Sequence, residues 1–204
     1  MLKRIINIII IISFITSCTS MYGIKKTKPL NEDEIIHQAK KYNIPIADNY
    51  ILDTSFYQFL VKLKDTSLEV AKNNHTQPLQ VLYYNQLQNW QMGSYHANCY
   101  TGGFPNLNWN RNGVFNTFIP GQQAPLDNLL TLKKHFEYLR SLTGVQPFNT
   151  INYDYIVLVY WSKFMGRQSK RLIQLVQDNA KLANDKKVKV IYVNNDNFFM
   201  HLNK

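Results

Sequence analysis

The feature that most constrains the fold is an unbroken apolar run at residues 155–161, Tyr-Ile-Val-Leu-Val-Tyr-Trp. A strand with no polar position is typical of the centre of a sheet that is covered on both faces. Residues 188–193 read as a second strand, and a helix is expected between the two. The predicted buried face of this helix consists of Leu172, Ile173, Val176, Ala180 and Ala183. Residues 154–193 therefore predict a βαβ unit with parallel strands and a right-handed crossover, which places the chain in the α/β class.

Patterns upstream of this unit predict further elements. Period-two alternation at 79–84 and 91–100 indicates an antiparallel strand pair. Helical spacing of apolar residues predicts helices from Asn31, from Asp53 and over 126–143. The helix at Asn31 has a clear start, because a capping residue is followed three positions later by a glutamate.

Residues 102–125 are expected to form a long loop rich in glycine, asparagine and proline. Loops of this length are uncommon in compact domains unless they are functional or mobile. The loop carries four aromatic residues, Phe104, Trp109, Phe115 and Phe118. These aromatics either anchor the loop to the core or form a contact surface, and the sequence leaves both interpretations open.

The first eighteen residues have the layout of an export signal. Lys3 and Arg4 precede an apolar stretch at 5–15, which is too short to span a membrane because a spanning helix needs roughly 20 apolar residues. Small residues then lead to Cys18. The segment resembles a bacterial lipoprotein signal peptide. This resemblance implies that residues 1–17 are removed, that the Cys18 sulfur carries a diacylglyceryl group, and that the new amine is acylated.

Acylation of Cys18 has consequences for location. Two or more acyl chains give stable anchoring, so the mature protein is expected at a membrane surface without crossing it. Residues 18–30 would then be a tether, and residues 31–204 the globular domain. Thr19 and Ser20 carry no acid that would mark inner-membrane retention, which favours the outer membrane facing the periplasm, with surface exposure left open. An ordinary signal peptide and an uncleaved anchor are the alternatives.

The chain is basic, with 23 Lys and Arg against 13 Asp and Glu and a formal net charge of +10. Removal of Lys3 and Arg4 with the signal lowers this charge to +8 and leaves 187 residues, a length that suits one domain. A basic envelope protein is attracted to phospholipid head groups or cell-wall polymers. The expected compartment excludes nucleic acid as a partner.

The βαβ unit resembles the thioredoxin-like superfamily over about forty residues. Residues Val157 to Trp161 resemble the central strand of that family. Residues Val190 to Asp196 resemble its next strand, including the acidic residue at the end of the strand. Aligned without gaps, the family's Cys-x-x-Cys motif falls on the sequence Gly-Arg-Gln-Ser. Gly166 and Ser169 therefore stand where the redox cysteines would be, and the resemblance implies that disulfide exchange has been lost.

The family's core continues with a cis-proline, an antiparallel strand pair and a packing helix, but only eleven residues follow Val193. Upstream, Pro78 stands before the strand pair, and the helix at 126–143 follows the pair. The resemblance therefore implies a thioredoxin-like three-layer sandwich that is circularly permuted, with an unpermuted mixed sandwich as the alternative. Pro78 would take the cis-proline position, or would be a trans proline opening a strand. Antiparallel pairing of 79–84 with 155–161 would support the permutation.

Candidate chemistry is sparse. Once Cys18 is acylated, Cys99 is the only thiol, so no intramolecular disulfide can form, and we expect Cys99 to be buried or inert. His96 is the nearest base, but residues three apart on a strand point to opposite faces. His75 and His135 complete no zinc spacing, so neither a metal nor a cofactor is expected.

Arg167, Lys170 and Arg171 lie near the start of the predicted helix, where an anion such as a phospholipid or glycan head group can bind. A solvated helix face is the plainer interpretation. The function favoured by the sequence is a non-catalytic, lipid-anchored binding or assembly module with an envelope protein or cell-wall partner. The alternatives are a single-thiol redox enzyme acting through Cys99 and a basic cell-wall adaptor.

Overall fold

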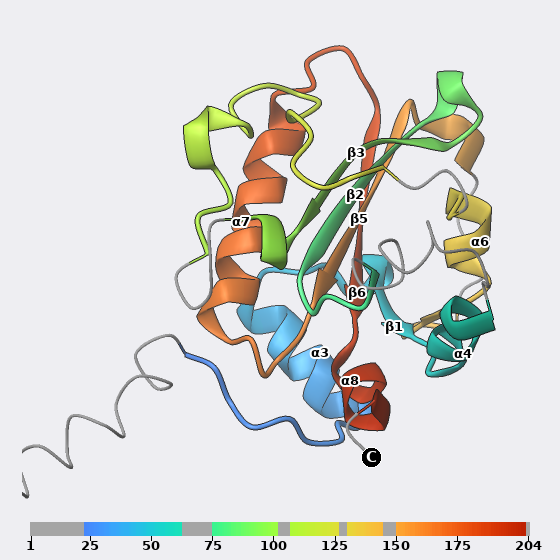
Figure 1. The fold of residues 1–204 in the computed structure, drawn as a ribbon, viewed down its shortest axis with the longest axis vertical. Helices are drawn as coiled ribbons and strands as arrows, with labels where there is room; N and C mark the ends of the chain where they lie inside the picture. Colours follow the sequence, from blue (N-terminus) through green and yellow to red (C-terminus); the bar gives the residue numbers. More distant parts are fainter. Residues whose placement is uncertain (1–22, 63–74, 102–106, 127–129, 145–149, 203–204) are drawn as a thin grey trace, which may run out of the picture.

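The protein is described by a computed structural model, which covers residues 23–62, 75–101, 107–126, 130–144 and 150–202. The fold is mixed α/β, with a six-stranded open sheet in the order β3-β2-β5-β6-β1-β4 (Figure 1). The strands are β1 (Asn49–Leu52), β2 (Gln80–Asn85), β3 (Gln91–Ala97), β4 (Leu139–Ser141), β5 (Tyr155–Trp161) and β6 (Val188–Asn194). Within the described residues five α-helices form, namely α3 (Glu32–Lys41), α4 (Ser55–Lys62), α6 (Leu132–Phe136), α7 (Arg167–Lys181) and α8 (Asp196–Leu202).

The predicted βαβ unit is confirmed at the centre of the sheet. β5 pairs in parallel with β6, with Leu158 opposite Ile191, and α7 connects the two strands. Every residue of β5 after Tyr155 is buried, as an uninterrupted apolar strand requires. Leu172 and Val176 are fully buried on α7, while its charged residues face outward.

The upstream strand pair is also confirmed. β2 and β3 are antiparallel, and β2 lies antiparallel beside β5 with Leu82 opposite Leu158. Pro78 precedes β2, and its carbonyl accepts a hydrogen bond of 3.0 Å from the Asn195 side chain. The cis-proline expectation is corrected, because the one cis peptide bond among the described residues joins Phe118 and Ile119.

The helix expected over 126–143 is wrong in extent. Thr131 caps α6 by accepting a hydrogen bond from the Lys134 amide, and the helix ends at Phe136. Residues Leu139–Ser141 instead form the edge strand β4, in which Arg140 pairs with Ile51 of β1. The leucines at helical spacing are therefore shared between a short helix and a strand, and the pairing with β1 satisfies the backbone. Residues 127–129 of this prediction lie outside the described residues.

Helices cover both faces of the sheet (Figure 1). One face packs against α3 and α7 and contains the cluster with Tyr42, Val159 and Trp161. The other face packs against α4, α6 and α8 and contains the cluster with Phe56 and Tyr160. The two clusters follow from the alternation of side chains along each strand, since neighbouring residues of β5 point to opposite faces.

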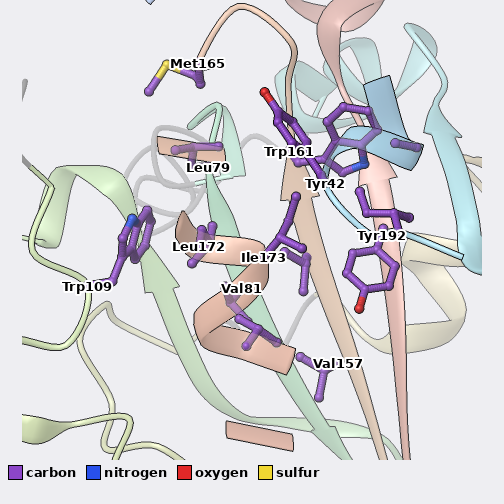
Figure 2. Packing of buried hydrophobic residues seen from close by; sticks show 14 of the residues in the cluster. Tyr42, Leu79, Val81, Trp109, Val157, Trp161, Met165, Leu172, Ile173 and Tyr192 are labelled. Carbon is purple, nitrogen blue, oxygen red and sulfur yellow. The ribbon is translucent and has the colours of Figure 1, made fainter. Parts of the chain in front are cut away.

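The long loop is part of the first cluster. Trp109 and Phe115 are buried, Phe118 is partly buried, and Figure 2 shows Trp109 pointing into the same cluster as Leu172 of α7. The aromatics therefore anchor the loop, and the interpretation of Trp109 as part of a contact surface is wrong. Phe104 lies outside the described residues.

Candidate functional site

The loop from β5 into α7 comes into close contact with the N-terminal segment of the chain. Gly166 adopts a positive φ of 49°, and a Cβ atom there would clash with the carbonyl oxygen of Gly23. On its other side, the Gly166 carbonyl accepts a hydrogen bond of 2.9 Å from the Tyr42 hydroxyl at the end of α3. Only glycine meets both the backbone angle and this close approach.

Residues 23–30, expected as part of the tether, lie against the domain. The Lys25 amide donates to the Phe164 carbonyl at 2.7 Å. Leu30 forms two hydrogen bonds with the Asn197 side chain in α8, one through its amide at 2.8 Å and one through its carbonyl at 2.9 Å. Figure 1 shows this segment in blue, passing from the start of α7 toward α3. Residues 18–22 of the expected tether lie outside the described residues.

An acidic residue links the segment to the loop before α7. Glu34 forms ion pairs with Lys28 at 2.8 Å and Lys163 at 3.2 Å. Hydrogen bonds from Lys28 and then Lys163 lower the pKa of Glu34 to about 2. The predicted capping box is present as well, so Glu34 also closes the start of α3.

Asp196 holds the same loop from the other side. This buried carboxylate accepts hydrogen bonds from the backbone amides of Lys163 at 2.7 Å and Phe164 at 3.2 Å. Burial raises its pKa, and the hydrogen bonds from the Lys163 amide and the Asn194 side chain oppose that rise. The sequence showed an acid after the strand but not this role. The signal available was a polar run, Asn-Asn-Asp, directly after an apolar strand.

The two positions that the resemblance aligns with the redox cysteines of the thioredoxin-like family, Gly166 and Ser169, offer no reactive side chain. Gly166 has none, and Ser169 is fully buried. The Ser169 hydroxyl donates to the Ser162 carbonyl at 2.7 Å and accepts from the Ser162 amide at 3.2 Å. Ser169 therefore stabilises the turn into α7.

Arg167, Lys170 and Arg171 are exposed on α7, and their spacing of three and four residues puts them on one side of the helix. Arg167 lies against Gly23, and the exposed Lys25 and Lys26 follow on the docked segment. These five cations are called the basic face below. None of them forms an ion pair with another residue of the described chain.

Cys99 is exposed in the turn Asn98–Tyr100, so of the expectation that this thiol is buried or inert, the burial is wrong. Partial desolvation raises its pKa, which lowers the thiolate fraction at neutral pH. His96 is buried, and its ring hydrogen-bonds with Ser94 and Gln123, both at 2.9 Å. Desolvation lowers the pKa of His96 to about 4. Its hydrogen bonds hold His96 within the core, so it does not serve as a base for the exposed thiol.

The structure brings together two histidines that are far apart in sequence. The rings of His75 and His135 are buried with their centroids 6.0 Å apart, and His135 Nδ1 lies 2.8 Å from the Tyr160 hydroxyl. Across the described ranges no group of three or more His, Cys, Asp or Glu side chains is placed to hold a metal ion.

Comparison of the chain with protein families, with curated proteins and with solved structures finds no match. No helix among the described residues has both the length and the apolar character needed to cross a bilayer.

Proposed function

We propose that this chain is a lipid-anchored, non-catalytic binding or assembly module of the bacterial cell envelope, built on a circularly permuted thioredoxin-like scaffold. The strand arrangement supports the scaffold. The antiparallel pair β2–β3 precedes the βαβ unit in the chain, yet β2 lies beside the central strand β5, as the family resemblance requires. Fold alone does not define activity, so the function rests on the site.

The observation that carries the proposal is the state of the redox-motif position. Gly23 covers Gly166, and Ser169 is buried with its hydroxyl hydrogen-bonded to Ser162. A thioredoxin-like protein needs an accessible thiolate at this position, because the thiolate is the nucleophile in disulfide exchange. This chain has neither the sulfur nor the open surface there, which favours binding over catalysis.

The N-terminal sequence supports the anchor. Cys18, carrying its acyl chains, is then the first residue of the mature protein and anchors it in the outer membrane, facing the periplasm. The test is metabolic labelling with radiolabelled palmitate. Label should enter the wild type and the Cys99→Ser variant and should be absent from Cys18→Ser. Equal label in Cys18→Ser, or none in the wild type, contradicts the anchor.

The redox alternative is tested separately on the purified mature protein. We expect no reduction of a protein disulfide or of a peroxide above the uncatalysed rate. Turnover that Cys99→Ser abolishes would establish the single-thiol enzyme instead. A pulldown from detergent-solubilised membranes then identifies the envelope partner.

A further inference from the structure

The path of the chain couples the proposed anchor to one surface of the domain. Gly23 lies against Arg167, the first residue of α7. Gly23 follows Cys18 by five residues, and five extended residues span at most about 18 Å. If Cys18 is acylated, the start of α7 cannot lie farther than this from the lipid.

We infer that the basic face docks on anionic phospholipid head groups of the leaflet that holds the acyl chains, and so sets the orientation of the domain on the membrane. The inference rests on the proposed acylation of Cys18. It assigns the cations at the start of α7 to one ligand, the phosphate-bearing surface of a bilayer.

The charge of the basic face is available to a partner. Glu34 pairs with Lys28 and Lys163, and Asp196 accepts hydrogen bonds from the Lys163 and Phe164 amides. Farther along α7, Asp178 pairs with Lys181. The five cations Lys25, Lys26, Arg167, Lys170 and Arg171 are exposed and keep their charge unpaired within the described chain. Each Lys or Arg brought near an anionic membrane strengthens association about fivefold.

The docked segment holds Lys25 and Lys26 in a fixed position relative to the cations of α7. The hydrogen bonds of Lys25 with Phe164 and of Leu30 with Asn197 fix the chain on both sides of the segment. Lys25 and Lys26 lie within this fixed segment, so they face the membrane together with the helix cations. A lipid surface is favoured over a cell-wall polymer because the anchor's short reach brings the bilayer to this face.

The experiment measures which end of the domain faces the lipid. Acylated protein carrying Cys99→Ser is labelled with a fluorophore at Gln174→Cys, which lies beside Lys170 and Arg171 on α7. The matched label is placed at Leu87→Cys, where the side chain is 88% exposed in the turn at the opposite end of the sheet. Vesicles contain phosphatidylethanolamine and phosphatidylglycerol, with a nitroxide on a lipid head group as quencher.

We expect stronger quenching at position 174 than at position 87, and loss of the difference in phosphatidylcholine vesicles or at 1 M salt, where the Debye length is about 3 Å. K170E/R171E should lower the ratio of docked to undocked protein more than about 25-fold. K186E/K187E makes the same charge change beyond the other end of α7 and should leave the quenching unchanged.

Equal quenching at both positions overturns the inference while leaving the proposed anchor intact. Salt-sensitive retention on cell-wall preparations combined with equal quenching assigns the basic face to a wall polymer, which also overturns it. Absence of acyl chains on Cys18 by mass spectrometry removes the proposed function and this inference with it.

Discussion

The side-chain amide of Asn179, on the inner side of α7, donates a hydrogen bond of 2.9 Å to the backbone carbonyl of Phe115 in the long loop. The same amide donates to the Thr117 carbonyl at 2.8 Å, and its oxygen accepts from the Tyr83 hydroxyl at 2.9 Å. One buried side chain therefore joins the helix, the loop and the sheet. The loop is held by these bonds in addition to its packed aromatics.

Replacing this residue should cost stability. Asn179→Ala leaves the buried Phe115 carbonyl and the buried Tyr83 hydroxyl without this partner, and each buried unsatisfied group costs roughly 1–3 kcal/mol. We expect the free energy of unfolding to fall by about 3 kcal/mol in urea titrations. Gln174→Ala, an exposed change on the same helix, is the control and should stay within about 0.5 kcal/mol of the wild type.

The approach of Gly23 to Gly166 predicts a specific effect of a methyl group. Gly166→Ala should displace the docked segment, because its Cβ would clash with the Gly23 carbonyl. Hydrogen exchange at the Lys25 amide, now bonded to Phe164, should rise toward the rate of an unprotected amide.

Gly144→Ala provides the control for that change. Gly144 has a similar positive φ of 69°, but among the described residues no heavy atom beyond its chain neighbours lies within 4 Å of the position that a Cβ atom would take. Its substitution should cost about 1–2 kcal/mol through backbone strain alone and leave Lys25 protected. Equal protection of Lys25 in both variants would show that the segment does not depend on the close contact.

His96 predicts a pH dependence of stability. Its pKa is lowered from 6.5 to about 4 on folding, so the unfolded chain binds more protons between these values. The contribution of neutral His96 to the free energy of unfolding is fully present above pH 6.5 and is lost as the pH falls toward 4. Below pH 4 this contribution does not change further. The loss is about 3 kcal/mol at 1.36 kcal/mol per pKa unit.

This contribution is isolated by a difference measurement. The free energy of unfolding of wild type and His96→Gln is compared at several pH values, which removes the titration of other groups. The free energy of unfolding of the wild type should fall relative to that of His96→Gln as the pH is lowered from 6.5 to 4. Parallel curves across that window would mean that His96 is not neutral in the folded protein.

Cys99 should be accessible to alkylating reagents but should react slowly at neutral pH. Its exposure allows alkylation, whereas its raised pKa keeps the thiolate fraction low at pH 7. We expect alkylation by iodoacetamide at pH 7 to be slower than that of a free peptide cysteine and to accelerate as the pH rises. Faster reaction than the peptide would reopen the redox function.

The sequence predicted the elements whose signals are local. The capping box at Asn31 and the apolar run of β5 are each complete within a few residues, and both appear as expected. β1 and β4 escaped prediction because each is short and is stabilised by pairing with a distant segment. The spacing of apolar residues around Leu139 is helical, but Leu139 lies in β4 because it pairs with Leu52 of the distant strand β1.

The site was predictable only in part. The sequence placed Arg167, Lys170 and Arg171 near the start of the predicted helix, and the structure has all three exposed there. The docking of residues 23–30 beside them could not be foreseen. It depends on contacts such as that of Leu30 with Asn197, which are 167 positions apart and leave no periodic pattern.

The strand order also governs when this protein can fold. The two central strands, β5 and β6, come from the last quarter of the chain, whereas β1, β2 and β3 precede them. Until Asn194 has been synthesised, β1 lacks its parallel neighbour and β2–β3 is an isolated hairpin of marginal stability. A growing polypeptide of this topology therefore cannot complete its sheet until nearly the whole chain is available.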